Sequence, residues 1–304
     1  MSIGMRHPKS FDTDVLIGID TETDVGSFTP FYEGVKKGVP LLIDLFEDKG
    51  IKSTFFYTGE AAEKNPGSVL MAKRAGHEIG CHSLWHETVG DELFPIPGVK
   101  PLLPSEVKPR LTLAADIIGS ITGERPVSFR APRLWGSTAL INTLEELGYI
   151  CDASYPLYFF RQQFEPYHPS SKNWTQKGDM KILEIPNFAD MTMVSLDGEL
   201  QRDRDQWPLI RIEGGERFFQ KCRDFADFVR GKGLRAVLCI YIHPWEFIEV
   251  EKSYHFGEAT VIPDPIITDN CGERALAELG IWIDMMLDAG AVFHRFDDFA
   301  KNWK

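Results

Sequence analysis

Glycines that end helices ahead of short apolar runs are the feature that most constrains the fold of this chain. A glycine readily takes the left-handed conformation that terminates a helix, and five helical patterns end this way. The glycines are Gly50, Gly76, Gly148, Gly233 and Gly290. The apolar runs that follow them lie at 53–57, 77–81, 149–152, 235–242 and 291–294. A repeated order of helix, glycine and strand predicts an α/β fold with parallel strands.

Further segments extend this pattern to most of the chain. A first strand is expected at 15–19 and another at 127–130. Helices are expected at 41–48, 69–74, 105–121, 138–147, 216–230 and 273–287. Together the segments form about seven or eight strand–helix units, which is near the usual size of a (β/α) barrel.

Two stretches lack this periodicity. Residues 91–104 are rich in proline, and residues 155–179 are rich in Pro, Tyr, Phe and Ser. Long loops in a compact domain more often carry function than not, so we expect both stretches to shape a binding site. We find no repeat, low-complexity tract or linker, and predict one domain over residues 1–304 with these two loops as insertions.

Net charge and cysteine content exclude some classes of binding partner and indicate a cellular compartment. A net charge of −12 argues against a nucleic-acid partner, because phosphate binding needs a basic face. No apolar run approaches the ~20 residues of a membrane span, and the first residues lack the apolar core of a secretory signal. The five cysteines form no CxxC pair and are expected to be free, mostly buried thiols. We therefore expect a cytoplasmic protein.

Two histidines four residues apart, His82 and His86, directly follow the apolar run at 77–81. Imidazole is the commonest protein ligand for zinc and similar ions. Two acids, Asp20 and Glu22, lie at the end of the first expected strand. They would point the same way if the chain is still extended there, and would then need a cation or an arginine beside them. The alternatives are histidines satisfied by loop backbone and acids exposed to solvent.

Three more residues with reactive or charged side chains follow expected strands: Arg130, Asp152 and His243. An arginine at the end of a buried strand is costly unless a carboxylate pairs with it. Asp152 could orient a histidine or cap a turn, and a single strand-end histidine is as often structural as catalytic. In a parallel barrel, however, catalytic side chains come from the carboxyl ends of the strands, so together these residues predict an active site.

These residues occur in an order that resembles the motifs of the polysaccharide deacetylase (NodB-homology) superfamily. The motifs are Gly18-Ile-Asp20-Thr-Glu22, His82-Ser-Leu-Trp-His86, Arg130-Ala-Pro-Arg-Leu-Trp-Gly136, Asp152-Ala-Ser and Ile240-Tyr-Ile-His243-Pro. The resemblance runs from about residue 15 to 296. It implies a distorted (β/α)7 barrel that holds one divalent ion, usually zinc, and hydrolyses an N-acyl bond.

The first motif departs from the pattern of the sugar deacetylases. They carry adjacent aspartates, whereas here Thr21 separates Asp20 from Glu22. This spacing resembles a branch that includes cyclic-imide and ureide hydrolases and cytoplasmic deacetylase-like proteins. The resemblance therefore implies hydrolysis of a non-peptide C–N bond without identifying the substrate.

The resemblance also suggests a metal site. Asp20, His82 and His86 are expected to bind one divalent ion, zinc first, with positions left open for water and substrate. Glu22 is expected to act as the general base that takes the proton of the water. The division of roles between Asp20 and Glu22 remains open at this point.

The other motif residues receive supporting roles. Arg130 is expected to hold the acids in place, and His243, tuned by Asp152, to protonate the departing amine. The expected substrates are an N-acylated sugar or a small amide or imide, and a homo-oligomer could help to enclose the pocket. The alternatives are a cyclic imide or ureide hydrolase and an inactive barrel that only binds carbohydrate.

Overall fold

A curled parallel sheet forms the centre of the molecule in the computed structural model, which describes residues 11–304. Seven strands follow one another around it in the order β9, β1, β2, β3, β4, β5, β8, and β12 lies beside the start of β1. Their bounds are β1 Asp14–Thr21, β2 Thr54–Tyr57, β3 Glu78–Cys81, β4 Ser128–Phe129, β5 Cys151–Asp152, β8 Leu183–Glu184, β9 Val237–Ile242 and β12 Val292–His294. All neighbouring pairs are parallel, as the sequence predicts.

A single bridge brings the two ends of the curled sheet together. Asn187, which follows β8, pairs in parallel with Cys239 of β9, and the amide of Phe188 donates to the carbonyl of Cys239 at 2.8 Å. Because the two edges meet at a single backbone bridge in the part of the chain that the structure describes, the barrel is distorted and not a regular closed cylinder. The distorted (β/α)7 barrel that the sequence predicts is therefore confirmed.

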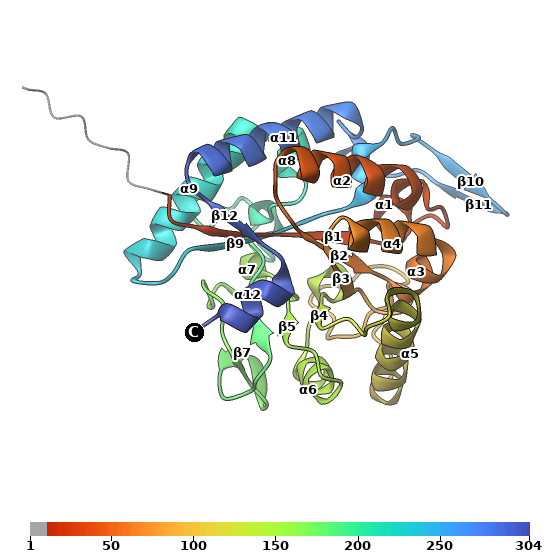
Figure 1. Ribbon diagram of the computed structural model, residues 1–304, viewed down its shortest axis with the longest axis horizontal. Coiled ribbons are helices and arrows are strands. Elements are labelled where there is room, and N and C mark those ends of the chain that lie inside the picture. The colour runs from red at the N-terminus through yellow and green to blue at the C-terminus, as the bar shows by residue number, and fades with distance from the viewer. Residues whose placement is uncertain (1–10) are drawn as a thin grey trace, which may run out of the picture.

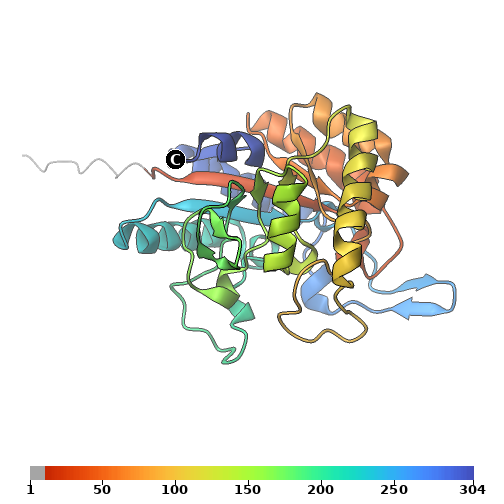
Figure 2. The ribbon, with the colours of Figure 1, turned by 90° about the horizontal axis from the view of Figure 1, so that it is seen from below.

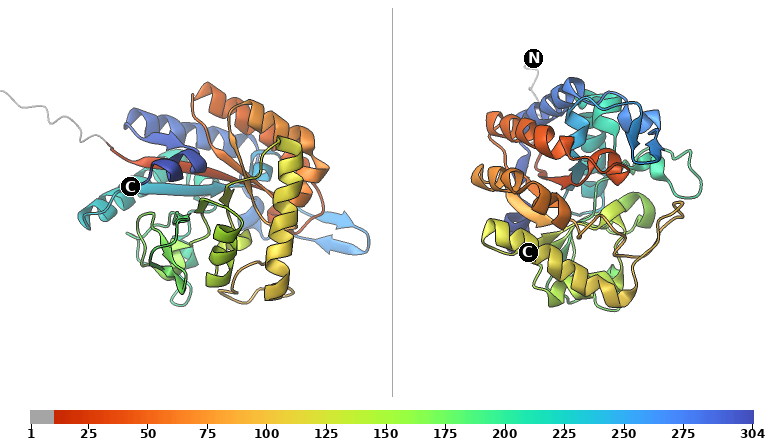
Figure 3. Two further views of the ribbon diagram at one scale, coloured as in Figure 1. Left: turned by 60° about the horizontal axis from the view of Figure 1, so that its bottom comes forward. Right: turned by 90° about the vertical axis from the view of Figure 1, so that its right-hand side faces the viewer.

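Helices cover the outside of the sheet (Figures 1 and 3). The long ones are α2 Val39–Asp48, α4 Pro66–Arg74, α5 Pro104–Thr122, α6 Thr138–Glu146, α9 Gly215–Gly231 and α11 Glu273–Asp288. Shorter helices are α1 Asp24–Ser27, α3 Gly59–Lys64, α7 Leu157–Phe160, α8 Leu209–Glu213, α10 Pro265–Thr268 and α12 Phe296–Asn302. The five helix-ending glycines all have positive φ, between 67° and 92°, which confirms the predicted terminations.

Two small hairpins were not expected from the sequence. Strands β6 Pro169–Ser170 and β7 Asn173–Lys177 lie inside the predicted loop at 155–179, and β10 Tyr254–Phe256 pairs with β11 Ala259–Val261. Figure 2 shows the β10–β11 hairpin projecting from one end of the body. The stretch at 91–104 contains no regular strand or helix before α5 begins.

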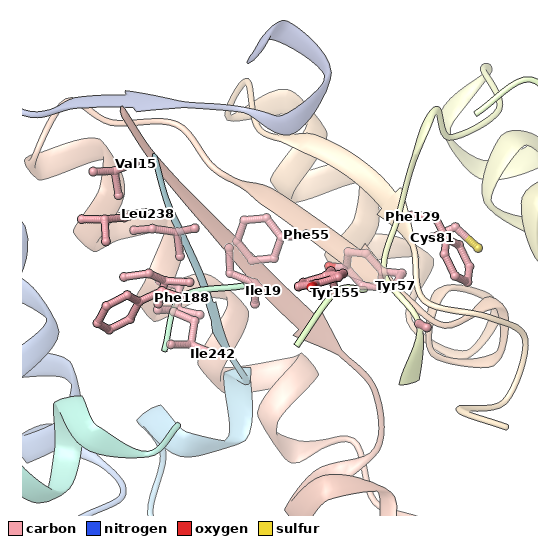
Figure 4. Close-up of a cluster of buried hydrophobic side chains, with 14 of the residues drawn as sticks. Val15, Ile19, Phe55, Tyr57, Cys81, Phe129, Tyr155, Phe188, Leu238 and Ile242 are labelled. Atoms are coloured by element: carbon pink, nitrogen blue, oxygen red, sulfur yellow. The ribbon is translucent and has the colours of Figure 1, made fainter. Parts of the chain in front are cut away.

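Strand β1 separates two apolar clusters because its side chains alternate. Val15, Ile17 and Ile19 belong to the large cluster between the sheet and the helices. Figure 4 shows Ile19 close to Phe55 within this cluster. Leu16 belongs to a second cluster, which also contains Phe296 of α12. Gly18, Asp20 and Glu22 follow Leu16 in the same alternation, so the sequence directs both acids toward the interior of the barrel.

Two further expectations can be compared with the described residues. All five cysteines are free thiols, and four of them are buried, as predicted. Within residues 11–304, none of the helices has the length and hydropathy needed to span a membrane.

Candidate active site

The predicted site residues lie at the carboxyl ends of neighbouring strands. Asp20 lies near the end of β1 and His82 directly follows β3. Arg130 follows β4, Asp152 ends β5 and His243 follows β9. Because parallel strands place these ends at one edge of the sheet, residues far apart in sequence meet there.

Glu22, His82 and His86 form a compact group whose ligand atoms lie within 4.8 Å of one another. The Glu22 Oε2 atom lies 2.7 Å from Nε2 of His86 and 3.2 Å from Nε2 of His82. The Glu22 side chain is only 1% exposed. The structure thus brings together one oxygen and two nitrogen donors in a buried position.

The polar atoms of this group fit a bound cation. The Nδ1 atom of His82 lies 2.7 Å from the Arg130 carbonyl oxygen, which only accepts, so His82 donates there and its Nε2 is free to bind. Both Glu22 oxygens are buried, and the imidazoles of His82 and His86 are the close polar neighbours of this carboxylate. Although burial raises the pKa of Glu22, the two histidines hold it well below its usual value. A buried carboxylate beside two imidazoles suits a divalent metal ion.

The position of Asp20 corrects the expected ligand set. Its Oδ1 atom accepts a hydrogen bond from Nη1 of Arg130 at 2.9 Å, and Asp20 is not part of the three-residue group. Asp20 lies within β1, where the buried guanidinium holds its short side chain. Glu22 lies beyond the end of β1 and its longer side chain reaches the two histidines. In this geometry Glu22, and not Asp20, lies within reach of the two imidazoles.

Arg130 is completely buried inside the barrel and is fixed on several sides. Its Nε donates to the Ala153 carbonyl at 3.2 Å, and its guanidinium carbon lies 4.7 Å from the ring centre of Phe56. The space for it exists because residue 18 is a glycine: a Cβ there would lie 2.0 Å from Nη1. Gly18, two residues before Asp20, thus lets Arg130 reach that carboxylate.

Asp152 does not contact His243, which corrects the expected tuning role. It accepts a hydrogen bond from the Ser154 hydroxyl at 2.5 Å and lies against the carboxyl group of Glu184. Glu184 in turn accepts hydrogen bonds from the amides of Ser154 and Tyr155. Burial raises the pKa of Asp152 to about 6. Burial and the neighbouring Asp152 also raise the pKa of Glu184 well above its usual value, because two adjacent buried carboxyl groups cannot both ionise at low cost.

Glu246, and not Asp152, contacts the imidazole of His243. Its Oε1 atom lies 2.9 Å from Nδ1 of His243, and its Oε2 accepts from Nε of the buried Arg211 at 2.8 Å. Burial lowers the pKa of His243, but the hydrogen bond and charge of Glu246 outweigh that effect and raise it. The Trp245 ring stacks on the imidazole at 27°. The signal in the sequence was an acid three residues after the histidine, in His243-Pro-Trp-Glu246.

A cavity of about 340 Å³ opens beside the group of Glu22, His82 and His86. Its other lining residues are Asp20, Gly26, Phe28, Phe94, Ile96, Arg133, Leu134, Tyr158, Arg202, Asp205, Trp207, Tyr241, His243 and Ile267. The loop at 91–104 contributes two of them, whereas the loop at 155–179 contributes only Tyr158. The segment 202–207, which carried no signal in the sequence, provides three.

Comparison with known proteins gives a match to one family over part of the chain. The polysaccharide deacetylase family model matches residues 24–151, a span that includes His82, His86 and Arg130. A peptidoglycan deacetylase from Helicobacter pylori is 27% identical over 227 residues, which are 75% of this chain and 71% of that protein. A peptidoglycan deacetylase-like protein from Gibberella zeae is 28% identical over 173 residues; these are 51% of this chain and only 48% of that protein.

Solved structures share the fold over nearly the whole chain. A putative polysaccharide deacetylase from Mycobacterium smegmatis has a TM-score of 0.64 at 18% identity, covering 97% of this chain and 91% of that chain. PuuE allantoinase has a TM-score of 0.63 at 19% identity, covering 98% and 92%. A family pseudoenzyme from Bacillus anthracis also shares the fold, with a TM-score of 0.52 at 12% identity and coverage of 96% and 66%. Residues 24–151 thus match the polysaccharide deacetylase family, and the barrel shares the fold of these solved structures over nearly the whole chain.

Proposed function

We propose that this protein is a metal-dependent hydrolase that cleaves a non-peptide carbon–nitrogen bond of an N-acyl compound. The observation that carries the proposal is the buried Glu22 carboxylate, whose Oε2 atom lies 2.7 Å and 3.2 Å from the Nε2 atoms of His86 and His82. Burying such a charge is costly unless a cation compensates it.

The donor set favours zinc. Two imidazole nitrogens and one carboxylate oxygen suit a zinc ion that keeps a position open for catalysis. A bound divalent ion would polarise the acyl oxygen and make the attacking water more acidic. His82 is oriented for this task by its hydrogen bond to the Arg130 carbonyl.

Asp20 is the residue best placed to act as general base. It lines the cavity beside Glu22, and its bond to Arg130 orients the carboxylate. The second oxygen of Asp20 has no hydrogen bond to another residue in the described part of the chain, so it can accept a proton from water. We therefore exchange the roles first expected for Asp20 and Glu22.

His243 is the residue best placed to act as general acid. It lines the same cavity, and its raised pKa keeps the imidazole protonated closer to neutral pH. Glu246 binds Nδ1, which leaves Nε2–H free to protonate a departing nitrogen. Without that proton the C–N bond breaks slowly, because an amide anion is a poor leaving group.

A small cyclic imide or ureide is the second candidate substrate, and the cavity favours it over a long glycan. Phe28, Phe94, Ile96, Trp207 and Ile267 line the cavity beside the polar groups. A volume of about 340 Å³ suits a small molecule. The fold shared with PuuE allantoinase is compatible with this choice. We further propose a cytoplasmic location, which suits a small soluble substrate better than a cell-wall polymer.

Metal analysis and substrate turnover test the proposal together. Purified protein should contain about one zinc per chain, and His82→Ala protein should lose the metal and the activity. Lys100→Ala, on the exposed surface, is the matched control. Activity should be measured on N-acetylated sugars, a chitooligosaccharide series and cyclic imides. Stoichiometric metal with no turnover of any of these would favour an inactive binding barrel, and full activity of His82→Ala would refute the proposal.

A further inference from the structure

We infer that the substrate carries a carboxylate group, which Arg133 and Arg202 bind at the wall of the cavity. This inference rests on the proposed function, because it identifies the chemical class of the compound that the same cavity takes. It would make the protein selective for small acidic N-acyl, imide or ureide compounds over neutral ones.

Arg133 presents a guanidinium to the cavity without a carboxylate partner. It lies in the turn Pro132–Leu134 with a φ of 61°, a conformation that a non-glycine residue rarely takes. Its Nη1 donates to the His86 carbonyl at 3.1 Å and reaches the Thr88 hydroxyl at 3.4 Å, both neutral acceptors. Within residues 11–304 it forms no ion pair, and its Nη2 and Nε form no hydrogen bond. These two nitrogens are therefore available to donate hydrogen bonds to a ligand.

Arg202 provides a second free guanidinium from a different loop. Its guanidinium carbon lies 4.7 Å from the ring centre of Phe94, and both residues line the cavity. Stacking on an aromatic ring leaves the edge of a guanidinium, which bears the N–H groups, available for an acceptor. Arg202 also lacks an ion-pair partner in the described part of the chain, although the protein has more acids than bases.

Two of the three carboxylates that line the cavity are engaged elsewhere, whereas the charge of Arg202 acts on the third, Asp205. Asp20 is bound to Arg130, and Glu22 belongs to the metal site. Asp205 accepts a hydrogen bond from the Tyr241 hydroxyl at 2.7 Å. The three lining acids are offset by the two lining guanidiniums and by the buried Arg130, so a bound divalent ion would leave the cavity with a positive charge. In a protein of net charge −12, such a local field would select an anionic ligand.

The chemistry of arginine points to a carboxylate on the ligand. A guanidinium forms two parallel hydrogen bonds with a planar carboxylate, and these charge-assisted bonds are stronger than bonds between neutral groups. The apolar side chains of Phe28, Ile96 and Ile267 line the same cavity and suit the short carbon chain between the carboxylate and the scissile bond.

Two probes of equal size test the inference by binding. N-acetyl-β-alanine carries a carboxylate, and its primary amide carries a neutral group of the same shape. Isothermal titration calorimetry of the metal-loaded protein should give a Kd about tenfold or more lower for the acid. The preference should weaken as salt concentration rises, because Arg202 is exposed.

Variants separate the arginines from the metal as the source of the preference. Arg202→Gln should reduce the preference several-fold without changing the metal content, because Arg202 does not contact the proposed ligands. Arg133→Gln should reduce it further and requires a metal assay, because Arg133 supports the His86 carbonyl. Arg223→Gln is the matched control: this exposed arginine lies 5.8 Å from the Phe219 ring and does not line the cavity.

The possible results distinguish this inference from the proposed function. Equal affinity for the two probes, or no measurable binding of the acid at millimolar concentration, refutes the inference. A preference that survives both arginine variants also refutes it, since the carboxylate would then bind the metal. If the metal-loaded protein hydrolyses neutral amides but shows no preference for the acid, the proposed function is supported and the inference of a carboxylate site is refuted. Wild-type protein that binds no divalent metal ion would refute the proposed function itself.

Discussion

Replacing Gly18 by alanine would place a methyl group where the guanidinium of Arg130 now lies. The added Cβ would be 2.0 Å from Nη1 and 2.6 Å from Cζ, well below the 3.4 Å at which ordinary contact begins. Arg130 is completely buried and held on several sides, so it cannot move aside without losing contacts. We expect the salt bridge between Arg130 and Asp20 to break.

The cost of this substitution can be estimated from the burial of the pair. Breaking a buried ion pair while its charges stay inside destabilises a protein by about 3–5 kcal/mol. For a chain of this size we expect a fall in melting temperature of roughly 6 °C or more. Because Asp20 would also lose its orientation, kcat should fall by about 100-fold or more if Asp20 is the base.

Urea denaturation and steady-state kinetics measure both effects. Gly67→Ala is the matched control, because a Cβ at Gly67, in the first turn of α4, meets no atom within 4 Å. A double-mutant cycle with Arg130→Lys isolates the contact, since alanine at position 18 should cost far less once the guanidinium is gone. A Gly18→Ala protein as stable and as active as the wild type would refute the packing argument.

Three further predictions address metal, proton transfer and stability. Removing the metal with a chelator should lower the melting temperature, and adding zinc back should restore it in the wild type but not in His82→Ala; equal curves would exclude the metal site. Glu246→Gln should shift the alkaline limb of kcat/KM to lower pH, because Glu246 raises the pKa of His243; an unchanged pH profile would remove His243 from the chemistry. Burial and the nearby Asp297 raise the pKa of Glu78 to about 7, so the folded state binds its proton more tightly than the unfolded chain. The contribution of Glu78 to stability should therefore fall as pH rises from about 4.5 to about 7, and Glu78→Gln should remove that decline in urea titrations across this range.

The elements with strong local signals could be predicted from the sequence. Helix-ending glycines require a left-handed conformation, and all five predicted ones adopt it. The buried strands β1 and β9 appear as continuous apolar runs because parallel strands have both faces covered. The hairpins β6–β7 and β10–β11 were missed because their strands are short and partly exposed.

The contacts between the site residues were harder to predict from the sequence than the identity of these residues. The sequence placed His243 and Asp152 at strand ends, but their contacts depend on three-dimensional packing. Glu184 lies beside Asp152 only because β5 and β8 are neighbours, and β8 is too short to recognise in advance. The contact of Glu246 with His243 could have been predicted, because Glu246 follows His243 by three residues. Its carboxylate binds both the backbone amide and the ring of His243.

The positions of Asp20 and Glu22 follow from where strand β1 ends. Both acids belong to the face of β1 that points into the barrel, so alternation alone cannot separate their roles. Asp20 is still paired with Phe56 of β2, at a depth where the guanidinium of Arg130 fills the barrel. Glu22 lies beyond Thr21, the last paired residue, at the level of His82 and His86, which follow β3. A carboxylate at that level reaches the imidazoles, whereas one two residues deeper reaches the arginine. The spacing Asp-x-Glu therefore gives the two acids different partners, and this difference supports the proposed roles of Asp20 as base and Glu22 as metal ligand.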